Sequence, residues 1–315
     1  MYEKWKGVHT RCAFNMIQEL IPLTRPRTLA AALGPTILGA AFSYYAFGAA
    51  QGTDLAIFHT VLIFLAVVTA QIVANLWNEY KDFKSGLDAG QKVGNAGSIT
   101  RGVITPELII TMIKVLMFVP IIIGLYLSAT ITWYYIPAGF LCILISFLYS
   151  GGPKPISRTP FGEISSGIAM GFAIVLITGY AWIRELSLAL LIPAIPSTLL
   201  VGSIMLTNNI RDIRNDESHG RHTLPIVLGR ERALSLMSIS YIFNFIWIIA
   251  WIIVGHMTWF ALLAFLAAPL AFKTIHTLSN NTDEFQLDKA MGTTAGSAMI
   301  YQLMWAIGLI MGKLF

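Results

Sequence analysis

Residues 186–207 read LSLALLIPAIPSTLLVGSIMLT, a run of 22 residues without a charged side chain. About 20 apolar residues are enough to cross the hydrocarbon core of a bilayer as a helix. Similar runs recur along the chain, because 56% of its 315 residues are hydrophobic and only 12% are charged. Soluble domains carry roughly 25% charged residues. With too few charges to cover a water-facing surface, the sequence predicts an all-α, polytopic membrane protein.

Working outward from this run, the sequence divides into nine expected membrane spans. A span in lipid must satisfy its own backbone hydrogen bonds, so each is expected to be a helix. Residues 1–27 are polar and basic with apolar residues at helical spacing, which predicts a short interfacial segment rather than a cleaved signal. We expect residues 28–315 to form a single transmembrane domain, with spans near 28–49, 54–78, 106–130, 132–150, 163–183, 187–209, 233–255, 257–278 and 292–312.

The basic residues predict how the chain is oriented. Of the 21 lysines and arginines, all but Lys114, Arg184 and Lys313 lie before the first span or on the side of the membrane that this segment occupies. The positive-inside rule therefore places the N-terminus and these loops in the cytoplasm, in the cell membrane. An odd number of spans leaves the C-terminus outside. Because topology accounts for the basic residues, they predict no nucleic-acid partner.

Two cytoplasmic loops follow a repeated pattern of polar residues. Residues 75–82 read NLWNEYKD and residues 209–216 read NIRDIRND, both of the form N-x-x-[N/D]-x-x-x-D. The two segments lie four predicted helices apart and follow helices that run in the same direction. This spacing indicates an internal duplication, which is common in membrane proteins.

The repeated pattern predicts a site for a cation. Residues four apart share a helix face, so Asn78 projects with Asp82, and Asp212 with Asp216. These acids lie at helix C-termini, where the macrodipole is already negative, so a cation is needed to compensate them. Oxygen-only ligands suit Mg²⁺, which bridges one or two carboxylates to phosphate oxygens. Two facing clusters of this kind fit a diphosphate held between two metal ions.

Three further residues extend these clusters, and an alternative interpretation competes with the metal site. Asn208 or Asn209 lies one turn before Asp212, and Asp88 returns towards the first cluster after the turn at Gly86. In the alternative, Arg211 and Arg214 neutralise the second cluster in simple surface ion pairs, which contribute little.

Five segments in order carry a resemblance to a known family: RPRTL at 25–29, NEYKDFKSGLD at 78–88, SITRG at 98–102, YSGGPKP at 149–155 followed by PFGE at 160–163, and NNIRDIRND at 208–216 leading to GRHTL at 220–224. Over nearly its whole length the chain resembles the membrane prenyltransferases that include 4-hydroxybenzoate polyprenyltransferases. It is most similar to their 1,4-dihydroxy-2-naphthoate branch, which acts in menaquinone synthesis. The six-residue step from Asp82 to Asp88 is typical of that branch. Glu79 departs from it, because the branch usually has Asp there, and helical spacing turns Glu79 off the Asn78–Asp82 face.

The resemblance implies a helical bundle around a central cavity that opens to lipid and is capped by cytoplasmic loops. It implies transfer of a polyprenyl group from polyprenyl diphosphate to 1,4-dihydroxy-2-naphthoate, with loss of CO₂ and diphosphate, giving demethylmenaquinone. Two Mg²⁺ ions would bridge the diphosphate. The residues that match the family's metal motifs are Asn78, Asp82, Asp88, Asn208, Asp212 and Asp216. The diphosphate positions are Arg25, Arg101, Arg221 and Asp88, and the catalytic set is Asp82, Asp212, Asp216 and Tyr149, with Tyr149 near the reacting prenyl carbon.

Two alternatives remain open at this stage. The first is a prenyltransferase for another aromatic acceptor, such as 4-hydroxybenzoate or homogentisate. The second is a secondary transporter, although transporters place polar sites near the midplane and the acids here lie at helix ends. The expected partners are polyprenyl diphosphate, an aromatic quinone precursor and the lipid bilayer, and no protein partner is predicted.

Overall fold

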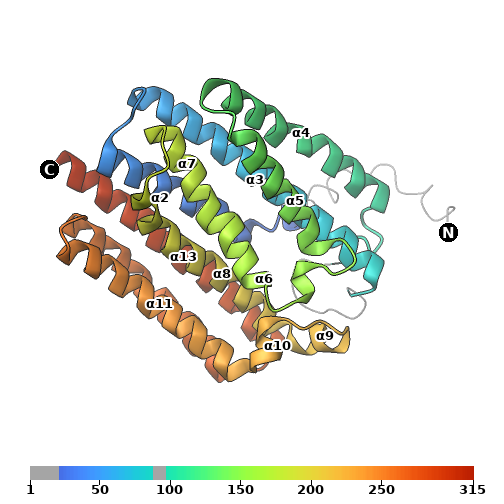
Figure 1. Cartoon of the computed structure of the whole chain (residues 1–315). Helices are drawn as coiled ribbons and strands as arrows, with labels where there is room; N and C mark the ends of the chain where they lie inside the picture. The colour runs from blue at the N-terminus through green and yellow to red at the C-terminus, as the bar shows by residue number, and fades with distance from the viewer. Residues whose placement is uncertain (1–20, 88–96) are drawn as a thin grey trace.

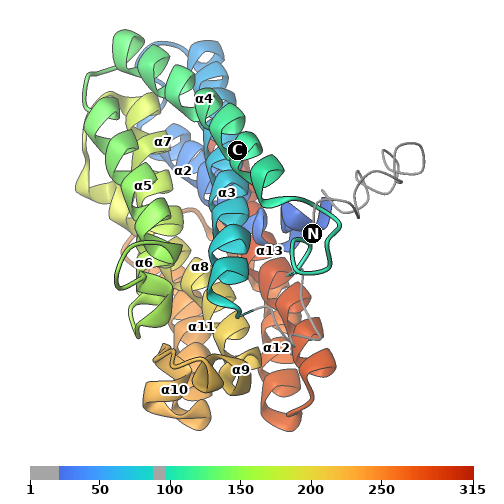
Figure 2. The same ribbon diagram turned by 90° about the vertical axis from the view of Figure 1, so that its right-hand side faces the viewer.

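The computed structural model describes residues 21–87 and 97–315, and every regular element within these ranges is a helix. The long helices lie side by side in one bundle, and the short helices α9 and α10 lie at one end of it (Figures 1 and 2). The α-helices are α2 (Ala30–Phe47), α3 (Thr53–Ser85), α4 (Pro106–Thr130), α5 (Tyr135–Ser150), α6 (Gly162–Ser166), α7 (Ala173–Ile183), α8 (Leu191–Arg211), α9 (Ile213–Ser218), α10 (Leu224–Leu228), α11 (Arg230–Ile253), α12 (Ala268–Asn280) and α13 (Glu284–Leu314).

Each predicted span corresponds to a helical stretch of the described chain. Seven stretches are long and apolar enough to cross a membrane. One of them joins α6 to α7 through a π-helical segment (Gly167–Phe172), and another joins a 3₁₀ segment (Trp259–Ala267) to α12. The remaining two predicted spans match α2, with 18 residues, and α5, with 16. The multi-pass membrane architecture is therefore confirmed, whereas the predicted interfacial helix lies mostly outside the described residues.

Several helices continue beyond the apolar runs that predicted them. Helix α3 does not end at Asn78 but runs to Ser85, and its 33 residues make a rod of about 50 Å. Helix α13 begins at Glu284 instead of residue 292, because the Asp283 side chain caps it by accepting a hydrogen bond from Gln286 N. These extensions carry polar residues past the roughly 30 Å hydrocarbon core. They bring the motif residues together at one end of the bundle.

The outer face of the bundle is apolar, as a lipid-facing surface requires. On α4, Phe118 and Ile122 are 62% and 61% exposed, and on α11 Ile246 and Ile253 are 58% and 79% exposed. Such extensive exposed apolar surface is not found on soluble monomers.

The interior is held by small and hydroxylated residues on α13. Thr294 hydrogen-bonds to Thr207 of α8 at 3.0 Å, and Ser297 hydrogen-bonds to Tyr241 of α11 at 3.0 Å. A Cβ atom on Gly308 would clash with the backbone of Phe260, so α13 approaches the 3₁₀ segment backbone to backbone. Van der Waals packing at close approach and interhelical hydrogen bonds are the main interactions that hold helices together in lipid. They fix the frame from which α3 and α8 project their polar ends.

Candidate active site

The end of α3 carries the first repeated motif on one continuous helix. Asp82 is buried, with 8% of its surface exposed, although it lies near the helix end. Asn78, one turn earlier, accepts a hydrogen bond through Oδ1 from Ser150 Oγ at 2.9 Å. This contact ties the motif to the last turn of α5.

The second motif is not on one continuous helix. Helix α8 ends at Arg211, and α9 begins at Ile213. The helix is therefore interrupted at Asp212, where φ and ψ are −94° and 6°. The Asp212 N–H still donates to Asn208 O, and the Asp216 N–H to Asp212 O. Asp216 therefore remains one turn beyond Asp212 but on a separate short helix, and its side chain is buried.

Arg221 joins the two motifs. Its Nη2 donates to Asp82 Oδ1 at 3.0 Å, and its Nη1 lies 3.3 Å from Asp216 Oδ1. All three side chains are largely buried, with exposed fractions between 3% and 12%. Two carboxylates that are 134 positions apart in the sequence thus face a single guanidinium. The two motifs come together where the end of α3 approaches α9 (Figure 2).

Asp212 is held by a different arginine. Arg211 contacts it twice at 2.7 Å, and also donates to Asn208 Oδ1 at 2.9 Å and to Asp288 Oδ1 of α13 at 2.8 Å. The pairing of Arg211 with the second cluster was the alternative interpretation of the sequence. It is correct as a contact, but this is no surface pair, because only 7% of the Arg211 side chain is exposed. Asp288 was missed, since it lies far along the chain and belongs to neither motif.

Arg25 is brought to the same end of the bundle by α3. Asn75 Nδ2 donates to Thr24 O at 3.0 Å, and Gln71 Nε2 donates to Thr28 O, so two side chains of α3 hold the segment on both sides of Arg25. Arg25 itself has a left-handed backbone, with φ of 50°. The positive charge of Arg25 favours the ionised form of Asp82. The first asparagine of the motif therefore helps to position a predicted diphosphate residue.

Glu79 has a positioning role that the sequence did not reveal. It is 1% exposed, and its Oε1 accepts hydrogen bonds from the N–H groups of Gly97 and Ser98 at 3.0 and 2.7 Å. These bonds attach the loop that carries Arg101 to the last turns of α3. Arg101 Nη2 in turn donates to Ser98 Oγ at 3.3 Å. Glu79 is thus turned away from the Asn78–Asp82 face, but it is not a freely exchangeable surface residue.

Tyr149 lies beside the motifs at the end of α5. A Cβ atom on Gly162 would be 3.4 Å from the Tyr149 hydroxyl oxygen, so this hydroxyl lies over the start of α6. The charges that act on it include those of Glu163, Arg221, Arg25 and Asp216. Tyr149 is therefore grouped with the predicted diphosphate residues.

The donor set fits a hard cation, although the carboxylates are now paired with arginines. In residues 21–87 and 97–315, no three His, Cys, Asp or Glu side chains are grouped closely enough to hold a metal by themselves. Mg²⁺ usually needs only one or two carboxylates besides phosphate oxygens and water. Asp216 Oδ2 is buried without a hydrogen-bond partner, which leaves one oxygen ready for a ligand. Asp88 lies outside the described residues.

The electrostatics of Asp216 also indicate a need for positive charge. Burial raises the pKa of Asp216 to about 7, the charges of Asp212 and Asp82 act in the same direction, and the Arg221 guanidinium acts against them. With this pKa, about half of the Asp216 carboxyl groups are protonated at neutral pH, and a stronger cationic partner would favour the ionised form. A divalent ion supplies that partner.

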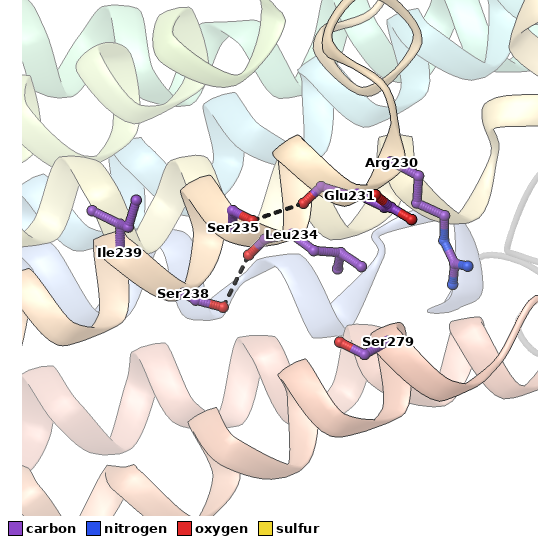
Figure 3. A pocket seen from close by; sticks show the side chains of 7 residues that line it. All are labelled: Arg230, Glu231, Leu234, Ser235, Ser238, Ile239 and Ser279. Atoms are coloured by element: carbon purple, nitrogen blue, oxygen red, sulfur yellow. Dashed lines mark hydrogen bonds between the residues drawn. The ribbon is translucent and has the colours of Figure 1, made fainter.

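A separate hollow between α11 and α12 contains none of the motif residues (Figure 3). Its Ser235 and Ser238 hydroxyls donate to carbonyl oxygens of their own helix, and Arg230 donates to the carbonyl oxygens of Leu278 and Asn281. These three side chains are thus engaged by the backbone, and the hollow lies apart from the motif residues at the ends of α3 and α8.

Comparisons with known proteins agree with this architecture. The UbiA prenyltransferase family profile matches residues 32–305. A Bacillus subtilis (strain 168) protein named 1,4-dihydroxy-2-naphthoate octaprenyltransferase is 35% identical over 303 residues, covering 94% of this chain and 93% of that protein. An Escherichia coli (strain K12) protein of the same name is 26% identical over 314 residues, covering 96% and 99%.

Solved structures share the fold. The apo structure of a UbiA homologue from Aeropyrum pernix K1 has a TM-score of 0.67 at 18% identity and covers 90% of this chain and 97% of its own. A UbiA homologue from Archaeoglobus fulgidus, bound to DMAPP and Mg²⁺, has a TM-score of 0.59 at 17% identity, with coverage of 92% and 99%.

Proposed function

The chain belongs to the UbiA prenyltransferase family, and on this premise we propose that it transfers a polyprenyl group from polyprenyl diphosphate to 1,4-dihydroxy-2-naphthoate. CO₂ and diphosphate leave, and the product is the hydroquinone form of demethylmenaquinone, because the transfer itself involves no oxidation. Family membership decides against the transporter alternative. The choice of acceptor rests on the names of the full-length relatives. The observation that supports the chemistry is the contact of Arg221 with an aspartate of each motif.

Mg²⁺ would be held by oxygens of both motifs together with the diphosphate. The proposed ligands are Asn78, Asp82, Asp88, Asn208, Asp212 and Asp216, with Asp88 included by its position in the motif. When bound, Mg²⁺ neutralises charge on the departing diphosphate and so lowers the barrier to breaking the allylic C–O bond. A bound DMAPP and Mg²⁺ in the Archaeoglobus fulgidus homologue supports the use of a divalent ion.

The chain's own residues supply the rest of the reaction. Arg221, released from the carboxylates, binds diphosphate oxygens together with Arg25 and Arg101, and so stabilises the leaving group. Tyr149 offers its π face to the allylic cation. Apolar walls keep water from this cation until a ring carbon attacks it. The new C–C bond forms at the ring, the bond to the carboxyl group breaks, and CO₂ leaves as the ring recovers its aromaticity.

A panel assay tests the reaction. Membranes containing the protein, Mg²⁺ and a polyprenyl diphosphate are given 1,4-dihydroxy-2-naphthoate labelled in its carboxyl carbon, 4-hydroxybenzoate or homogentisate. We expect prenylated product and labelled CO₂ from the naphthoate, and neither in EDTA. Transfer only to another acid would overturn the acceptor, and full activity in EDTA would overturn the metal.

We also propose that the aspartate motifs lie on the cytoplasmic side of the cell membrane, with the N-terminus inside and the C-terminus outside. Ser85 and Ser218 are exposed at the motif end, and Gln51 is exposed at the opposite end. In a cysteine-free background, cysteines at Ser85 and Ser218 should be labelled only from the cytoplasm, and a cysteine at Gln51 only from outside. The reverse pattern contradicts the proposed orientation.

A further inference from the structure

Glu163 is a buried carboxylate that the proposed reaction has not used. It lies in the first turn of α6, is 5% exposed, and accepts a hydrogen bond through Oε1 from Asn209 Nδ2 at 2.8 Å. Its other oxygen, Oε2, is buried without a hydrogen-bond partner. Buried acceptors are nearly always satisfied, because leaving one unpaired costs free energy. An unpaired carboxylate oxygen therefore calls for a ligand.

The backbone around Glu163 cannot easily move to satisfy this oxygen. A Cβ atom on Gly167 would meet Thr198 O at 2.5 Å, and one on Gly171 would meet the backbone of Ser197 at 2.6 Å. The π-helical segment thus packs directly on α8. π-Helical turns are frequent at functional sites. Glu163 is consequently held in place by the packing of its helical segment on α8 and by the hydrogen bond from Asn209.

The free oxygen belongs to the same group of side chains as the proposed reaction centre. Tyr149 places its hydroxyl over Gly162, the residue before Glu163. Among the charged side chains near this hydroxyl, Glu163 has the largest electrostatic effect on it, and Arg221 and Asp216 act on it from the diphosphate side. The diphosphate residues are positively charged or would hold cations, whereas the ionised form of Glu163 offers only acceptors. Its chemistry matches a hydroxyl donor, not a phosphate.

We propose that Glu163 Oε2 accepts a hydrogen bond from a ring hydroxyl of the aromatic acceptor. The bond orients the ring towards the allylic carbon and raises the electron density of the ring as the new C–C bond forms. The hydroxyl keeps its proton, and the electron pair of the new bond comes from the ring. Asn209 acts as a positioning residue, because its bond to Oε1 fixes where Oε2 points. This inference rests on the proposed aromatic prenylation.

Glu163→Gln separates this role from a purely structural one. The glutamine carbonyl still accepts from Asn209, so the contact between α6 and α8 is kept, but Oε2 is replaced by an NH₂ group that cannot accept. We expect kcat/KM for the acceptor to fall about 10- to 100-fold, as for loss of a hydrogen bond to a charged group. The KM for polyprenyl diphosphate and the Mg²⁺ requirement should not change. The exposed Glu217→Gln is the matched control and should retain full activity.

A cycle that combines the protein variant with acceptor analogues completes the test. Wild type and Glu163→Gln are each assayed with the dihydroxy acceptor and with analogues that carry a methyl ether at one hydroxyl. If Glu163 binds that hydroxyl, methylation should slow wild type at least 10-fold more than it slows the variant, because the two changes remove the same bond. Equal losses in both proteins, or an effect confined to polyprenyl diphosphate or Mg²⁺, would overturn the inference.

Failure of the proposed acceptor gives a different result. If wild type does not use the naphthoate but prenylates another hydroxylated acid, the same cycle on that acid decides the role of Glu163. If no hydroxylated aromatic compound is prenylated, the proposed function and the inference are both overturned.

Discussion

The end of α3 and the junction of α8 with α9 repeat one spacing of polar residues, but their side chains are engaged differently. On α3 the helix is continuous, and Asp82 contacts only the shared Arg221 among the ion pairs of the described chain. At the junction the helix breaks, and Asp212 is held by Arg211, which also contacts Asp288. The outermost acids, Asp82 and Asp216, meet at the same guanidinium.

This difference shows which positions of the duplication carry chemistry and which carry structure. The first asparagines both act on protein groups, since Asn75 holds the Arg25 segment and Asn209 holds Glu163. The last acids of the two motifs, Asp82 and Asp216, both face Arg221. The middle positions diverge, because Asn78 is bonded to Ser150 while Asp212 is neutralised by its neighbour. We infer that a cation displaces an arginine on each side, Arg221 from Asp82 on α3 and Arg211 from Asp212 at the end of α8.

The largest expected effect comes from the two acids that the regions share. Asp82→Asn and Asp216→Asn should each lower kcat by about 10²–10³, the loss typical of removing one transition-state stabilising group. Asparagine keeps the volume and one oxygen, so folding should survive. Glu217→Gln, next to Asp216 but exposed, is the control and should act like wild type. Activity would be measured at equal protein level, and a large loss in only one of the two variants would break the symmetry of the pair.

A smaller loss is expected when the bridge is altered but its charge is kept. Arg221→Lys retains the positive charge but offers a single ammonium nitrogen in place of the two Nη atoms that contact Asp82 and Asp216, so it cannot bind a diphosphate bidentately. We expect kcat/KM for polyprenyl diphosphate to fall about 10- to 100-fold. The exposed Arg214→Lys should have no effect. An unchanged Arg221→Lys would mean that the bridge is only an ion pair of the ligand-free protein.

The sequence predicted the spans well, because the thickness of the bilayer sets the length of an apolar run. The repeated spacing predicted that the two motifs face each other, but not that Asp82 and Asp216 share one arginine. Helical spacing alone could not reveal the break at Asp212, since it treats the segment as one helix. The contacts of Asp288 and Glu79 were equally hidden, because their partners lie on other helices or loops and no local pattern identifies them.

The environment of Asp216 predicts that metal binding depends on pH. Its raised pKa of about 7 means that a proton occupies the carboxylate below pH 7 and competes with the metal. Lowering the pH from 8 to 6 should therefore weaken Mn²⁺ binding, used as a probe for Mg²⁺, by roughly tenfold. Binding would be measured by electron paramagnetic resonance without diphosphate, which has titrations of its own. Asp216→Asn should bind weakly at both pH values and lose this dependence.

The smallest expected effect compares the first asparagines of the two motifs through stability. Asn75→Ala removes a hydrogen bond to a backbone carbonyl, and Asn209→Ala removes the side-chain donor to Glu163 Oε1. An ordinary hydrogen bond contributes about 1 kcal/mol, whereas an unpaired buried polar group costs about 1–3 kcal/mol and a charged one more. Asn209→Ala should therefore lower Tm in detergent more than Asn75→Ala does. Asn280→Ala, exposed and bonded only to its own helix, sets the baseline. If Asn75→Ala is the more destabilising variant, then holding the Arg25 segment matters more to the fold than pairing the buried carboxylate, and the two regions differ in the opposite sense from the one argued here.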